Sequence, residues 1–162
     1  MPEANPYARF LDQRPVLEIL AATPLALEAV LQNIPPEQVA ASPAPGKWSP
    51  AEILCHLADC EIAFAFRLRQ TLAEEHHVMQ PFDQDRWAAT YKGIPAAQAL
   101  ATFVTLRQWN LLLARTALPG AADKTVNHPE RGDMTFTTIL ETMAGHDINH
   151  LRQLQTLAGF GG

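Results

Sequence analysis

The sequence has no long apolar run and no excess of basic residues, which excludes two broad classes of protein. Its apolar stretches are short, such as residues 111–114, whereas a membrane-spanning helix needs about 18 consecutive apolar residues. With 12 Lys and Arg against 17 Asp and Glu, the formal net charge is −5. Such a chain offers no general attraction for phosphate backbones or anionic lipids. We therefore expect neither a nucleic acid nor a membrane as a partner.

Cysteine is scarce, and the two that are present are not placed to form a disulfide. Cys55 and Cys60 are five residues apart in a segment predicted to be helical, so their thiols point about 140° apart around the helix axis. Residues 1–14 are polar and contain prolines, unlike the basic and then apolar sequence of a secretory signal. Both features predict a cytoplasmic protein with reduced thiols.

Several short enzyme motifs are also missing. No glycine-rich phosphate-binding loop opens a helix, and neither C-x-x-C nor G-x-S-x-G occurs. The E-x-x-H pairs of di-iron helical bundles are absent around the C-terminal histidines. These absences argue against nucleotide binding, a nucleophilic serine elbow and a two-metal centre.

The composition that remains is that of one globular domain, which we place over residues 1–162. Apolar residues make up 48% and charged residues 18% of the chain. Apolar side chains recur with helical spacing in four stretches, separated by proline and glycine: residues 15–34, 50–71, 96–118 and 135–159. Pro24 interrupts the first stretch, as a kink or as the start of a fresh helix. We predict an all-α fold, an antiparallel four-helix bundle.

Two connections and one helix start stand out. The link over residues 76–95 is long and mixed in composition, with a short helical turn expected at 85–90, and such links often pack over the mouth of a site. Residues 121–135 predict a short loop or a small hairpin before the last helix. Ser49, Pro50 and Glu52 form a capping box, which gives the second helix the clearest start in the sequence.

Three histidines lie on stripes that should face the core of the bundle. His146 and His150 are separated by four residues on the last helix, so both imidazoles can converge on one point. His56 lies on the apolar face of the second helix. Buried imidazoles cost free energy unless each finds a partner, and a single divalent ion would satisfy all three. Three protein ligands also leave a coordination position open, which is typical of catalytic sites.

A metal-free interpretation stays open, because inward histidines are often hydrogen-bonded in a core and H-x-x-x-H also arises by chance. The three together favour one divalent metal ion. Zn and Ni are the expected ions, although imidazole also suits Cu and Fe.

Two further residues are candidate helpers of the reaction. Asp59 follows the first histidine by three positions and either orients its ring or is solvated. Arg107 lies on the inward stripe of the third helix, where it either anchors a substrate carboxylate or, as we favour, pairs with Asp59 or Glu61. Asp147 is rotated about 100° from the neighbouring histidine, so we expect it to face solvent or a dimer partner.

The order and spacing of these motifs resemble a known family. Residues 47–61 resemble the W-S-x-x-E-x-x-x-H-L-x-D-x-E opening of the DinB-like superfamily, and residues 144–154 resemble its closing H-D-x-x-H-x-x-Q helix. Residues 82–91 and 128–132 resemble the connections of its DinB/YfiT-like branch. The resemblance spans about residues 14–158. It implies an up-down-down-up four-helix bundle, often a homodimer, with a divalent metal held by His56, His146 and His150.

The resemblance also suggests functions. Relatives include metal-dependent hydrolases and transferases or isomerases that use low-molecular-weight thiols. We expect a mononuclear metal-dependent hydrolase or thiol-dependent transferase that acts on a small molecule such as a low-molecular-weight thiol. The alternative is a non-catalytic, metal- or ligand-binding stress-response dimer.

Overall fold

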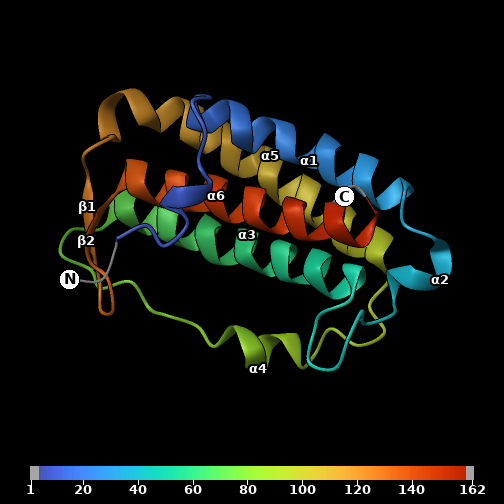
Figure 1. Ribbon diagram of the computed structural model, residues 1–162. Helices are drawn as coiled ribbons and strands as arrows, with labels where there is room; N and C mark the ends of the chain where they lie inside the picture. Colours follow the sequence, from blue (N-terminus) through green and yellow to red (C-terminus); the bar gives the residue numbers. More distant parts are fainter. Residues whose placement is uncertain (1–3, 160–162) are drawn as a thin grey trace.

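The computed structural model describes residues 4–159 and is built on four long helices (Figure 1). These are α1 (Val16–Gln32), α3 (Pro50–Ala73), α5 (Ala96–Ala121) and α6 (Phe136–Leu157). The short elements are the 3₁₀ helix η1 (Ala8–Phe10), α2 (Pro36–Val39), α4 (Gln84–Ala88) and the strands β1 (Thr125–His128) and β2 (Gly132–Thr135). Within residues 4–159, no helix combines the length and the hydropathy that crossing a membrane would take. The predicted helical bundle is confirmed, with a two-stranded sheet added to it.

The directions of the helices differ from a bundle that is antiparallel throughout. Figure 1 shows α1 and α6 running one way along the bundle and α3 and α5 running the other way. Each of α3 and α1 packs against both α5 and α6, so the parallel helices α3 and α5 are neighbours. The prediction of an antiparallel bundle was wrong in this respect, and the up-down-down-up order implied by the resemblance describes the structure.

The long link between α3 and α5 makes this order possible. Two parallel helices can follow each other in sequence only if the connection returns along the helix, and α3, with 24 residues, is about 36 Å long. Residues 74–95, at roughly 3.3 Å each when extended, span that distance with room for α4. The link is anchored at both ends. The Met79 N–H donates to the Asn127 carbonyl at 2.8 Å, and the Tyr91 hydroxyl donates to Asp59 Oδ2 at 2.8 Å.

The start of α3 follows from local chemistry. The Ser49 side chain accepts from the Glu52 N–H at 3.3 Å, and Glu52 Oε2 accepts from the Ser49 N–H at 2.7 Å. Pro50 occupies the first helical position, where its missing N–H has no cost. This capping box sets the first turn of α3 and therefore the position of His56, which follows within two turns.

Two prolines lie inside helices rather than at their ends. Pro24 lies within a single continuous α1, and Pro119 lies within α5, which ends at Ala121 instead of at the predicted Pro119-Gly120 boundary. Pro119 lacks the N–H that would donate to the Arg115 carbonyl, and α5 continues for only two residues beyond it. The end of this helix, predicted at residue 118 from the proline, was therefore too early.

The core divides into two apolar clusters. One contains the C-terminal part of α3 and most of α6, and the other contains the N-terminal part of α3 and the last turns of α6. Between them, at the middle of the bundle, lies a layer of buried polar side chains: His56, Glu61, Arg107, His146, Asp147 and His150. This layer contains the candidate site.

Candidate metal centre

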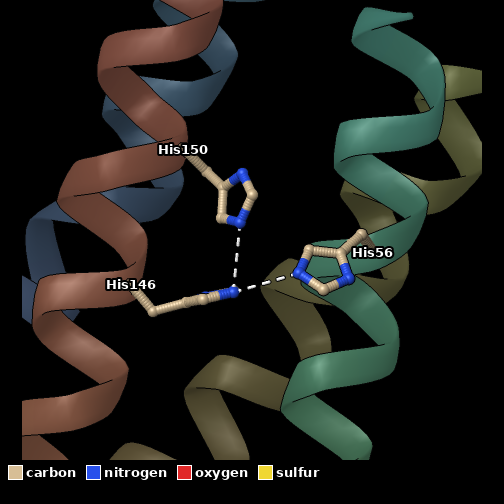
Figure 2. A group of neighbouring side chains, drawn as sticks. All are labelled: His56, His146 and His150. Atoms are coloured by element: carbon tan, nitrogen blue, oxygen red, sulfur yellow. Dashed lines mark hydrogen bonds between the residues drawn. The ribbon is translucent and has the colours of Figure 1, made fainter. Parts of the chain in front are cut away.

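The three predicted histidines meet inside the bundle. His56 comes from α3 and His146 and His150 come from α6, with 2%, 5% and 6% of their surfaces exposed. His146 Nε2 is 3.0 Å from His56 Nε2 and 3.1 Å from His150 Nε2. Figure 2 shows the rings of α6 directed toward the ring of α3. One nitrogen of each ring lies within 4.8 Å of the others, so the three residues could hold one metal ion.

Protons alone do not satisfy this arrangement. His150 Nδ1 is 2.8 Å from Gln153 Oε1, an amide oxygen that only accepts, so the ring carries its proton on Nδ1 and leaves a lone pair on Nε2. If His146 Nε2 carries a proton, it can donate that proton fully to only one of its two neighbours, His56 Nε2 or His150 Nε2. A cation at the point where the three lone pairs converge would satisfy all three nitrogens at once.

Burial keeps the rings neutral and ready to bind a metal. It lowers the pKa of His56 to about 3, with a further contribution from His150. It also lowers the pKa of His146 well below the ordinary value, helped by the two neighbouring histidines, and it lowers the pKa of His150. At neutral pH the imidazoles are therefore neutral, with one nitrogen free of a proton, which is the form that binds metal.

Aromatic rings fix the orientation of the imidazoles. The Trp48 ring centroid lies 4.7 Å from that of His56 and 6.5 Å from that of His150. The Tyr7 ring meets His146 edge-on at 5.1 Å. The N-terminal segment can approach this closely because residue 145 is glycine: a Cβ there would lie 2.5 Å from the Tyr7 carbonyl oxygen. These contacts exclude water from one side of the cluster.

Cys60 is a neighbour of the site that our sequence reasoning missed. Its Sγ lies 3.5 Å from His56 Nε2 and 3.9 Å from His146 Nε2. Burial raises the pKa of this thiol, so it is protonated in the absence of a metal. The signal was available, because Cys60 follows His56 by four residues on the same inward stripe.

A buried ion network lies beside the histidines. Arg107, 1% exposed, donates to Glu61 Oε1 at 2.6 Å and to both oxygens of Asp147 at 2.5 and 3.1 Å. It also donates to the Leu20 carbonyl at 3.0 Å. In a regular helix this carbonyl would accept from the N–H of residue 24, but Pro24 has no N–H. The proline in α1 thus frees an acceptor for the buried guanidinium.

This network corrects one sequence-based expectation, for Asp147, and agrees with the favoured one for Arg107. Asp147 does not face solvent or a partner but is 2% exposed, because α6 is covered by α1, α3 and η1. Arg107 is enclosed by carboxylates, so the structure does not offer it to a substrate; the favoured pairing with Glu61 is observed. Two carboxylates around one guanidinium leave a net charge of −1 next to His146, which favours a cation at the histidines.

Asp59 pairs with Tyr91 rather than with the His56 ring. Its carboxylate accepts the hydrogen bond from the Tyr91 hydroxyl and so holds the link against α3. No hydrogen bond joins it to His56 within the described part of the chain. Asp59 is thus a structural anchor of the link.

A pocket of about 330 Å³ leads to the histidine cluster. His56, Cys60 and His146 lie on its wall, together with residues from the N-terminal segment, the link and the β-hairpin. Its size suits a small molecule. His128, just before the hairpin turn, also lines it.

Known proteins similar to this chain include relatives whose names refer to a metal. A relative from Oceanobacillus iheyensis named “Putative metal-dependent hydrolase” is 27% identical over 135 residues, covering 83% of this chain and 78% of the relative. A protein of the same name from Bacillus cereus is 23% identical over 162 residues, covering 94% and 93%.

The structure of YfiT from Bacillus subtilis, described as a probable metal-dependent hydrolase with an unusual four-helix bundle topology, shares the fold. It superposes with a TM-score of 0.78 at 22% identity, covering 89% of this chain and 86% of that one. The family model of the DinB superfamily matches residues 19–154. The chain therefore belongs to the DinB superfamily.

Proposed function

We propose that this protein is a mononuclear metal-dependent hydrolase of small molecules. The observation that carries the proposal is the convergence of three buried Nε2 atoms beside a pocket of about 330 Å³. A site with three protein ligands keeps room for a further group, which a closed structural site lacks. The names of the relatives support the same reaction class.

The residues of the chain have separable roles in this proposal. His56, His146 and His150 would hold the ion, which would supply a Lewis acid that activates water at neutral pH. Gln153 keeps the His150 proton on Nδ1, so that Nε2 faces the ion. Trp48 packs against the rings of His56 and His150 and keeps solvent from their far side.

For the ion itself we propose Zn or Ni, because three neutral imidazoles suit both. Metal analysis of untagged protein by mass spectrometry tests this. We expect about one ion per chain, lost in the His56→Ala variant and retained in His76→Asn, which replaces a histidine outside the cluster. Wild-type protein without stoichiometric metal would contradict the proposal.

The reaction class is tested with metal-loaded and metal-free protein on ester, amide and phosphoester substrates, each with and without a low-molecular-weight thiol. We expect metal-dependent hydrolysis that needs no thiol. Turnover only with the thiol would replace hydrolysis by thiol transfer. Full metal loading without turnover of any substrate would favour the non-catalytic, metal-binding alternative.

We also propose that the protein works as a cytoplasmic homodimer. Phe66 on α3 and Trp109 on the adjacent α5 are each 62% exposed, and such apolar surface is typical of an interface. The two free, buried cysteines suit a reducing compartment. Sedimentation velocity should give a dimer for the wild type and a monomer for Phe66→Glu; a monomeric wild type would contradict the dimer.

A further inference from the structure

We propose that the pocket beside the histidine cluster selects anionic small molecules, and that Arg67 and Arg131 bind their carboxylate or phosphate group. This inference rests on the proposed function, because it names the substrate class of the same pocket. Arg67 lies on α3, nearly two turns beyond Cys60, and Arg131 lies in the turn between β1 and β2. Both line the pocket together with His56 and His146.

The two arginines have no carboxylate partner in the described part of the chain. Three other arginines do: Arg14 pairs with Asp12, Arg86 with Asp83, and Arg107 with Glu61 and Asp147. A guanidinium without a carboxylate, at the wall of a pocket, is available to bind an anion from solution.

Arg67 is held in place without being neutralised. Its Nη2 donates to the Gln80 carbonyl at 3.1 Å, and the guanidinium lies 5.5 Å from the Phe82 ring centroid and 5.8 Å from that of Phe64. The two rings and the carbonyl fix the plane of the guanidinium but leave most of its N–H groups unused. An oxyanion can therefore bind to it in the bidentate geometry that arginine favours.

His128 adds a hydrogen-bond donor to the pocket. His128 is 3% exposed, and its Nδ1 accepts from the Glu130 N–H at 3.2 Å, so the proton of the neutral ring lies on Nε2. Glu130 is the one carboxylate among the residues that line the pocket, and it is exposed. Two guanidiniums against one carboxylate give the residues that line the pocket a net charge of +1, although the whole chain carries −5. The buried network of Arg107, Glu61 and Asp147 does not line the pocket.

This reversal of sign carries the inference. A pocket built only for a neutral molecule would gain nothing from two guanidiniums that face a single exposed carboxylate. The guanidiniums also disfavour each other, because burial and then the charge of Arg131 lower the pKa of Arg67. An anion that binds between them removes that repulsion. Its charged group would then lie in the same pocket as the histidine cluster.

Titration calorimetry with inorganic phosphate as the probe tests the inference on metal-free protein, in which direct binding of phosphate to a metal cannot contribute. We expect saturable binding that weakens with added NaCl. Arg67→Gln and Arg131→Gln should each weaken it at least tenfold. Arg115→Gln, which removes an exposed arginine of α5 outside the pocket, should leave it unchanged.

Two variants guard against a loss of folding. The Arg131 side chain makes no hydrogen bond or ion pair within the described residues, so Arg131→Gln should keep the melting temperature of the wild type. Arg67→Lys keeps the charge and should retain part of the affinity. Wild-type protein that binds no phosphate, or Gln variants that bind it like the wild type, would overturn the inference.

Metal analysis tests the proposed function independently of the phosphate titration. Protein that binds metal but not phosphate refutes only the anionic substrate. Protein that binds phosphate but no metal refutes the hydrolase while leaving the anion site in place.

Discussion

Gln153 offers a test of the metal centre that leaves its ligands intact. Its side-chain oxygen accepts the Nδ1 proton of His150 at 2.8 Å, and the rest of the residue is exposed on α6. Removing such a hydrogen bond typically costs 10–100-fold in metal affinity, which is about 1.4–2.7 kcal/mol. We therefore expect Gln153→Ala to weaken metal binding by this factor while changing the free energy of unfolding of the metal-free protein by no more than about 0.5 kcal/mol.

The assay is competition for Zn²⁺ with a chromophoric chelator. Gln153→Glu keeps an acceptor at the same place and should bind Zn²⁺ at least as tightly as the wild type, because a carboxylate raises the basicity of the ring. Gln155→Ala is the matched control on the same helix. Equal affinities of Gln153→Ala and the wild type would refute the reasoning that this hydrogen bond orients His150.

Three further predictions follow from the buried polar layer. His150→Ala should abolish metal retention, measured by mass spectrometry, and lower the melting temperature, because two imidazoles stay buried without a shared cation. The free energy of unfolding of the metal-free protein should fall as the pH drops below about 6.5, since folding lowers the histidine pKa values and the unfolded chain then binds more protons. Each ring contributes up to about 1.4 kcal/mol per pH unit, so a flat profile in urea titrations would contradict these pKa shifts. Asp147→Asn should cost about 3 kcal/mol in the same titrations, because Arg107 loses a buried partner, whereas Asp12→Asn, at an exposed ion pair, should cost much less.

The parts of this fold that were predicted correctly depend on local sequence. The capping box at Ser49 needs only the side chains of one helical turn. The pairing of His146 with His150 needs only helical geometry, and His56 could be added because it lies on an apolar stripe. These signals are contained within single helices, so a sequence without coordinates is enough to find them.

The errors arose where a residue's surroundings come from other helices. Asp147 was expected outside because its own helix directs it away from the histidine face, yet Arg107 on α5 and the chain that covers α6 bury it. Arg67 and Arg131 are far apart in sequence and line one pocket only because the fold brings α3 and the turn between β1 and β2 to it. The parallel arrangement of α3 and α5 could be inferred from the resemblance but not from periodicity, which carries no direction.

The contact between Tyr7 and Gly145 has a practical consequence for work on this protein. Tyr7 packs on Gly145, the residue that precedes the candidate ligand His146, and no side chain larger than that of glycine fits at position 145. A polyhistidine tag attached ahead of Met1 would begin about six residues from that point, within reach of the cluster at roughly 3.3 Å per residue. It could supply foreign imidazoles to the bound ion or displace the segment. A C-terminal or cleavable tag avoids both artefacts.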